Sequence, residues 1–282
     1  MYSLTITNDR GDETILTNNP NYTIYKIDGL TPPKVTINDS VNTTTDGSKI
    51  NSVRLEKRNI VIYLKIEGEA EKNRIDLYSI FPIKRRVTLH FANGSRDVSI
   101  RGVVESNEPG IFDQAQTAQI SIICEDPYFS ETEDLTTVFG DVVPMFQFPF
   151  AIPAEGVVFS VLEKNTRQTI FNSGEVETGI IIELFAYGEV VNPVIYDTLA
   201  KTQMALNFTM QQSDKIVIDT NTRKKSITLI RSGKQTNLLG YMRPDSVFLK
   251  LQPGDNVFTY DCDSGVSNLQ LTFISSILYT GV

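Results

Sequence analysis

The chain has 282 residues, of which 40% are hydrophobic and 21% charged, so its composition predicts a globular protein of one large or two ordinary domains. A formal net charge of −8 argues against a general nucleic-acid-binding surface, which requires clustered positive charge. The opening residues already follow a strand pattern. We therefore expect neither a signal peptide nor a membrane span, and expect the chain to fold in a cytoplasm.

The segment 31–57 differs from the short strands predicted over 2–30. Pro32 and Pro33 open a polar run, and residues 39–47 contain almost no candidates for a core. The pair Asp46-Gly47 could turn a long hairpin. A long polar excursion of this kind either carries a function or is a plain surface loop, and the residues alone leave both alternatives open.

A strand and a short helix are predicted next. Apolar residues at alternate positions of 60–66 share one face, as in a strand with a buried side. Acidic residues at 69–71 suit the start of a helix. The spacing of Ile75, Tyr78 and Phe81, with Leu77 and Ile80 beside them, predicts its apolar stripe. Pro82 should end this helix.

A β-hairpin follows at Asn93-Gly94, the preferred pair for a two-residue type I′ turn. This turn would place His90 opposite Asp97, with apolar side chains on one face of the hairpin and polar side chains on the other. We therefore expect His90 and Asp97 to form a surface pair with no catalytic role.

A domain boundary is predicted at the acidic stretch 130–134, which gives domains 1–133 and 134–282. Short strand candidates separated by turns fill residues 157–282, a spacing typical of a β-sandwich. Cys124 and Cys262 fall on apolar strand faces, so we expect two buried thiols and no disulfide.

Catalytic chemistry finds little support in the residues. One histidine and two core-facing cysteines cannot build a typical transition-metal site or a Cys-His nucleophile. Glu125 and Asp126 are adjacent and would point apart in a strand, unlike the facing acids of a glycosidase. We expect no enzyme, no catalytic residue, no metal and no cofactor.

A family resemblance arises from blocks in a fixed order. The first half runs from a strand through a helix ending in Phe81-Pro82 and a hairpin to the block 124–129, Cys-Glu-Asp-Pro-Tyr-Phe. The second half adds blocks at 188–193, 214–220, 251–256 and 279–282. In this order the chain resembles the distal tail proteins of siphophages and prophages.

The resemblance implies a mainly β fold. An N-terminal β-sandwich or split-barrel domain with one short helix would precede a galectin-like β-sandwich. It also implies a structural virion protein at the distal end of a long non-contractile tail, made and assembled in the bacterial host cytoplasm. Identical subunits would close into a ring, usually a hexamer, around a channel.

The expected partners follow from the same resemblance. The N-terminal domain would form the ring and continue the tail tube. The C-terminal domain would dock a tail-associated lysin or fibre, or a receptor-binding protein. DNA would only pass through the channel, and no membrane insertion is expected.

Candidate interface residues come from the segment 31–57, which resembles an arm that wraps the neighbouring subunit, and from the basic run after the helix. They are Asn38, Asp39, Asn42, Thr44, Asp46, Lys49, Arg54, Lys84, Arg85 and Arg86.

The alternative function is a carbohydrate-binding adhesion module of the tail tip. The chain has no tryptophan and no histidine after residue 90, although a flat amphipathic ring is well suited to cover the apolar face of a sugar. Tyr187, Tyr196 and Tyr241 are therefore the candidates for glycan contact, with Tyr260 as a further substitute.

Overall fold

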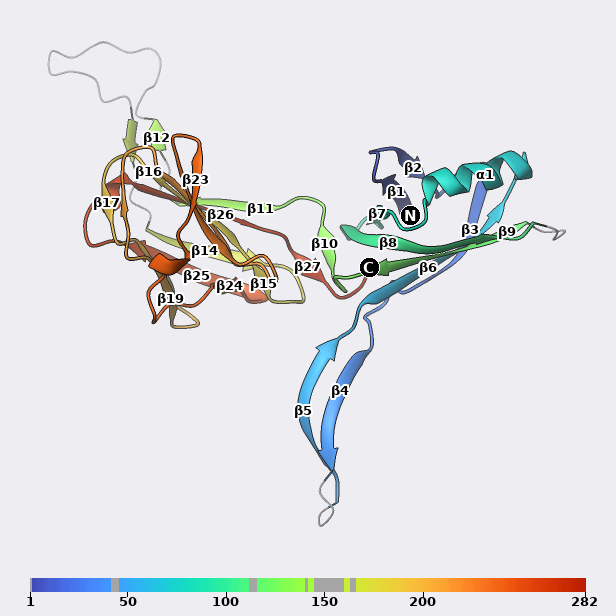
Figure 1. Ribbon diagram of the computed structural model, residues 1–282, viewed down its shortest axis with the longest axis horizontal. Coiled ribbons are helices and arrows are strands. Elements are labelled where there is room, and N and C mark those ends of the chain that lie inside the picture. The colour runs from blue at the N-terminus through green and yellow to red at the C-terminus, as the bar shows by residue number, and fades with distance from the viewer. Residues whose placement is uncertain (1, 42–45, 112–115, 140–141, 145–159, 163–165) are drawn as a thin grey trace, which may run out of the picture. The chain divides into compact units, whose positions relative to one another are not determined.

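A computed structural model describes residues 2–41, 46–111, 116–139, 142–144, 160–162 and 166–282 (Figure 1). The chain divides into two compact units, one of Met1–Thr132 with Leu278–Val282 and the other of Glu133–Ile277. The second unit is thus inserted into the first. The domain boundary expected from the sequence cut the chain once, after residue 133. Residues 278–282 nevertheless return to the first unit, because a strand at their start pairs there.

The first unit is built on a nine-stranded sheet whose main path follows the order β2-β1-β7-β8-β9-β6-β3. These strands are β1 (Ser3–Asn8), β2 (Glu13–Ile15), β3 (Tyr22–Asp28), β6 (Arg58–Ile66), β7 (Arg86–Ala92), β8 (Asp97–Pro109) and β9 (Thr117–Cys124). The short strand β10 (Phe129–Glu131) pairs with β8 and with β27 (Leu278–Tyr279).

Strand β6 confirms the predicted alternation, because Ile60, Ile62 and Leu64 are completely buried. Helix α1 (Ala70–Ile80) ends close to its predicted position and packs against β1, β6 and β8. Its buried side was predicted only in part, since Leu77 and Phe81 are completely buried but Ile75 and Tyr78 are exposed.

The buried side of α1 instead carries Asn73, Leu77 and Phe81, spaced four residues apart. Asn73 can be buried on this side because its hydrogen bonds are satisfied. The Asn73 amide donates to the Glu67 carbonyl at 2.7 Å, and the Asn73 carbonyl accepts from the Tyr22 hydroxyl at 2.9 Å.

The register predicted for the hairpin β7–β8 is wrong by two residues, since Ala92 pairs with Asp97 and the loop spans 93–96. The Asn93 side-chain oxygen accepts hydrogen bonds from the backbone amides of Ser95 and Arg96, at 3.0 and 2.8 Å. Within this loop only Gly94 has a positive φ, so the turn is not type I′. A shift of two residues leaves every side chain on its predicted face, which is why the face pattern did not distinguish the two registers.

Strands β4 (Val35–Val41) and β5 (Ser48–Leu55) form a hairpin between β3 and β6, and we call residues 35–55 the arm. Within the described residues the two strands pair only with each other, and Figure 1 shows them leaving the sheet of the first unit together.

The second unit is a β-sandwich, as the sequence predicted. One sheet has the order β11-β26-β16-β21-β22-β23 and the other β14-β25-β18-β19. Apolar side chains from both sheets, including Phe273 and Phe258, form one buried core.

The strands of these two sheets are β11 (Leu135–Phe139), β14 (Arg167–Asn172), β16 (Ile181–Ala186), β18 (Val194–Asp197), β19 (Thr202–Ala205), β21 (Lys215–Asp219), β22 (Ser226–Arg231), β23 (Lys234–Asn237), β25 (Gly254–Asp261) and β26 (Leu269–Ser275). Short pairs join β12 (Val142–Pro144) to β13 (Ser160–Leu162), β15 (Thr178–Gly179) to β24 (Lys250–Leu251) and β17 (Val190–Val191) to β20 (Thr209–Met210). The 3-10 helices are η1 (Leu239–Tyr241) and η2 (Val266–Asn268). The mainly β class is therefore confirmed.

Candidate assembly surfaces

The arm has one apolar and one polar face. Paired residues on its apolar face are Val35 with Leu55 and Ile37 with Val53, followed by Val41 and Ile50 toward the tip. Leu55 is partly buried, and Val41 is 75% exposed. The remaining four, Val35, Ile37, Ile50 and Val53, are about half exposed. A β-branched face of this kind normally packs against another layer, so its exposure marks an interaction surface.

A β-bulge keeps this apolar face continuous. The pairing register shifts by one residue between Asn38 and Asp39, which leaves Asn51 as the extra residue on β5. Without that shift Ile50 would pair with Ser40 and point to the polar face. Because the sequence pattern does not reveal a bulge, residues 39–47 read as a polar run and the apolar face was not predicted.

The interface candidates in 31–57 lie on both faces and at the tip. Asn38, Lys49 and Arg54 are on the polar face, where the Asn38 amide donates to the Ser52 hydroxyl at 3.0 Å. Asp39 shares the apolar face opposite Ile50, and Asp46 is exposed near the tip. Asn42 and Thr44 lie outside the described residues.

The base of the arm is closed by Gly29 and Arg58. Gly29 has φ +89°, and a Cβ there would lie 2.2 Å from the Asn59 carbonyl oxygen, so only glycine allows this approach. Arg58 is 2% exposed. Its guanidinium donates to the carbonyls of Gly29, Thr31 (2.9 Å), Pro127 (2.7 Å) and Thr280 (2.5 Å). Burial lowers the pKa of Arg58 below its usual value.

The basic run after α1 is exposed and contacts acids of its own unit. Arg85 forms an ion pair with Asp9 at 2.8 Å, and Arg86 lies 4.0 Å from Glu125. Lys84 adopts a positive φ of 64° in the turn that joins α1 to β7. Because these contacts lie within one unit, they do not test the expectation that Lys84, Arg85 and Arg86 contact a neighbouring subunit.

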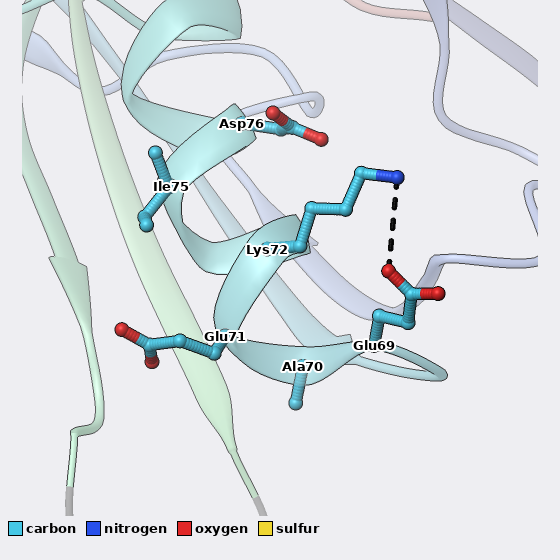
Figure 2. Close-up of a pocket in the computed structure, with 6 residues that line it drawn as sticks. All are labelled: Glu69, Ala70, Glu71, Lys72, Ile75 and Asp76. Carbon is cyan, nitrogen blue, oxygen red and sulfur yellow. Dashed lines mark ion pairs between the residues drawn. The ribbon is translucent and has the colours of Figure 1, made fainter.

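A hollow of about 570 Å³ lies on the exposed side of α1, where Figure 2 shows acidic side chains around Ala70 and Ile75. Lys72 points toward Glu69, with 3.7 Å between Nζ and Oε2. Ile75 is 53% exposed, so the outer side of the helix presents an apolar residue within an acidic surround.

The glycan candidates lie on separate elements, and no ring contact joins any two of them within the described residues. The Tyr187 hydroxyl donates to Gln270 at 2.9 Å, and Tyr241 packs edge-on against Phe208. Tyr260 is 5% exposed and belongs to the core.

Tyr196 differs from the other tyrosines because it lines a hollow of about 400 Å³. It pairs with Gln203 on one side and Thr259 on the other, which places the three in a row across β19, β18 and β25. Thr202 and Lys201 also line this hollow.

The second unit matches a protein-family model over residues 173–275. That model describes the siphovirus-type tail component, C-terminal domain. Residues 173–275 belong to this tail-component family. The resemblance to siphophage distal tail proteins predicted from the sequence is confirmed.

Solved structures extend the similarity in fold to nearly the whole chain. The crystal structure of SPP1 Dit (gp 19.1), described as a paradigm of the hub adsorption apparatus in phages that infect Gram-positive bacteria, has a TM-score of 0.68 at 12% identity and covers 98% of both chains. A chain of the phage P2 baseplate in its activated conformation with Ca has a TM-score of 0.52 at 14% identity, again covering 98% of both. No curated protein sequence matches the chain.

The single histidine of the chain lies in a polar surface cluster. His90 Nε2 lies 2.5 Å from Asp97 Oδ1 and 3.0 Å from Thr132 Oγ1. The expected His90–Asp97 surface pair is confirmed, although it forms diagonally because His90 pairs with Ser99. Both contacts use the same ring nitrogen, so the imidazole does not bridge Asp97 to Thr132 as a histidine does in a nucleophilic triad.

Cys124 is fully buried, as predicted, and burial raises its pKa to about 12. Cys262 is partly exposed, contrary to the expectation, and both are free thiols. Over the described part of the chain, no group of three or more His, Cys, Asp or Glu residues could hold a metal ion. None of the helices described there is long and apolar enough to cross a membrane.

Proposed function

We propose that the chain assembles into a closed ring of identical subunits, of about six copies, at the distal end of the tail tube. The ring carries no enzymatic activity and is assembled in the host cytoplasm before incorporation into the tail tip. The apolar face of the arm is the observation that carries this proposal.

The arm reaches beyond its own sheet. Seven residues of β4 span about 23 Å at 3.3 Å per residue, enough to pass over the edge of a neighbouring subunit. Within the described residues no strand pairs with the arm, and its apolar side chains are exposed. A second copy of the chain is therefore the proposed cover for this face.

Burial of the apolar face contributes a favourable term to assembly. Full burial of a Val or Ile side chain contributes about 1.5–3 kcal/mol, so covering five that are 48% to 75% exposed contributes roughly 5 kcal/mol per arm. Each subunit of a closed ring both gives and receives one arm, so this gain recurs at every interface.

Paired substitutions on the two arm faces test the proposal. Ile37→Thr with Val53→Thr keeps β-branched residues in the strands but removes apolar surface, and we expect loss of the ring. The matched control, Asn38→Thr with Ser52→Thr, changes the polar face and should leave rings intact. Native mass spectrometry reads the subunit number. Wild-type protein that stays monomeric at high concentration, or rings equally abundant in both variants, would contradict the proposal.

The second unit is the proposed docking site for other tail proteins, such as a lysin, a fibre or a receptor-binding protein. Its exposed side chains include Phe171, Leu199 and Val247, which are 61%, 59% and 46% exposed. The test is co-purification of the isolated ring with each neighbouring tail protein. Failure of every tail protein to bind would contradict this assignment.

A second candidate function, saccharide binding, is favoured by the hollow at Tyr196. An aromatic ring flanked by an amide and hydroxyl groups can cover the apolar face of a sugar and bond its hydroxyls. Saturation-transfer NMR with methyl glycosides tests it. Signals lost in Tyr196→Ala but kept in Tyr187→Ala support this site, whereas no signal with the wild type contradicts it.

A further inference from the structure

The base of the arm contacts residues 280–282, which follow the second unit in the sequence. The Val282 amide donates to the Leu30 carbonyl at 3.1 Å, next to the point where Arg58 Nη1 bonds Gly29 and Thr31. Arg58 Nη2 bonds Thr280 at 2.5 Å, so one guanidinium holds both the arm base and this segment.

The segment 279–282 is itself held in place. Arg96 stacks its guanidinium 4.3 Å from the Tyr279 ring centroid and donates to the Gly281 carbonyl. Phe129, which pairs with Tyr279 in β10–β27, carries the Arg58 guanidinium 4.6 Å over its own ring. Two arginines therefore fix the segment through stacking and main-chain hydrogen bonds.

The packing of the segment against the arm base leaves little room for a side chain at Gly281. A Cβ there would lie 3.1 Å from the Leu30 carbonyl oxygen and 3.1 Å from Pro32 Cδ. The ring of Pro32 restricts its backbone, so Pro32 cannot easily move away from a side chain at position 281.

We propose that residues 279–282 and Arg58 act as a brace that sets the direction of the arm. The brace contacts Gly29, Leu30, Thr31 and Pro32, which immediately precede the arm, whereas the outer part of the hairpin is free of these contacts. Arg58 is thus a positioning residue for assembly, since it orients an element that makes the contact elsewhere.

The guanidinium is suited to this role by its geometry. It presents five donors in a fixed plane and reaches four carbonyls from three separate segments, whereas a lysine ammonium offers only three donors from one point. Arg58→Lys should therefore keep the charge but lose the brace.

The inference rests on the proposed ring, so its test has one readout that does not need the ring. Hydrogen exchange followed by mass spectrometry on dilute monomer measures opening at residues 29–34 and 56–59. We expect Arg58→Lys and Gly281→Ala each to speed exchange there by roughly tenfold. The rest of the sheet should keep its protection. Native mass spectrometry on the same variants should show weakened rings.

The control is Gly240→Ala in the second unit, where a Cβ meets nothing within 4 Å. This control should change neither exchange at the arm base nor the ring. Unchanged exchange at the arm base in both brace variants would overturn the inference, and so would faster exchange spread evenly over the first unit. Rings absent from the wild type would instead contradict the proposed function and leave the exchange result to decide the brace.

Discussion

At the scale of single residues, two glycines show how backbone conformation and the space around a residue each restrict which residue a position accepts. Gly29 and Gly11 have nearly the same positive φ, +89° and +87°, but only Gly29 faces a backbone carbonyl at a forbidden distance. The two glycines therefore separate the cost of backbone strain from the cost of a clash.

We expect Gly11→Ala to lower the free energy of unfolding by about 1 kcal/mol, from strain alone. Gly29→Ala adds a clash with the Asn59 carbonyl and should cost about 3 kcal/mol or more. Urea unfolding of both variants measures the difference. Equal losses would show that the arm base relaxes without penalty.

A buried carboxylate in the second unit links stability to pH. The Asp214 side chain is 1% exposed and accepts two hydrogen bonds from Arg231, from Nε at 2.7 Å and Nη2 at 2.5 Å. The Arg231 guanidinium lowers the pKa of Asp214 below the usual 3.8, and the Gln211 amide adds to this.

A lowered folded-state pKa means that this stabilisation is present above pH 3.8 and disappears as pH falls through the folded value. Asp214→Asn should therefore be less stable than the wild type at pH 7, and the gap should narrow below pH 3.8. Thermal unfolding from pH 7 to pH 3 measures it, with the exposed Asp245→Asn as control. A gap that widens in acid would contradict the assignment.

At the scale of elements, the sequence predicted what local periodicity determines. The alternation in β6 and the end of α1 at Pro82 follow from neighbouring residues, and both are confirmed. Asn73 on the buried side of α1 was missed because its hydrogen-bond partners, Glu67 and Tyr22, follow no helical spacing. The β7–β8 register was missed because the Asn93 side-chain oxygen accepts hydrogen bonds from the Ser95 and Arg96 amides and stabilises a longer loop.

The arm, too, could be predicted only in part from the sequence. The arm's position and the turn residues Asp46 and Gly47 could be found from the sequence, but its apolar face depends on a bulge at Asn51. The brace could not be found, because it joins Arg58 to Thr280 across 222 positions with no periodic pattern.

Shortening the arm tests its independence as an element. Replacing Asn38–Lys49 by Asn-Gly should abolish rings while leaving the first unit folded, because those of the removed residues that the structure describes contribute nothing to its core. Circular dichroism and native mass spectrometry measure the two outcomes. Persistent rings would remove the arm from the interface, and a collapsed dichroism spectrum would show that it also supports the sheet.

At the scale of the whole molecule, net charge bears on what can pass through a ring. A channel lined with free cations would release counterions from DNA and retain it, whereas a net charge of −8 allows a repelling surface. Arg85 and Arg86 face acids of their own unit, which reduces their availability to DNA.

We expect the assembled protein to show no measurable affinity for duplex DNA at about 50 mM salt, where phosphate contacts are strongest. Fluorescence anisotropy with a labelled duplex measures this, and an unrelated basic protein serves as the positive control. Binding that weakens steeply with added salt would place basic side chains such as Lys84 on the channel surface.

The insertion of the second unit into the first has a consequence for the order of synthesis. Residues 278–282 leave the ribosome only after all of residues 133–277, so the first unit stays incomplete while the second is being made. During that interval the arm base lacks the contacts of Thr280 and Val282. Nascent chains on one messenger are crowded together. If the arm makes the proposed contact between subunits, an arm without a set direction would not bind a neighbour, and translation would delay assembly until both units of a subunit exist.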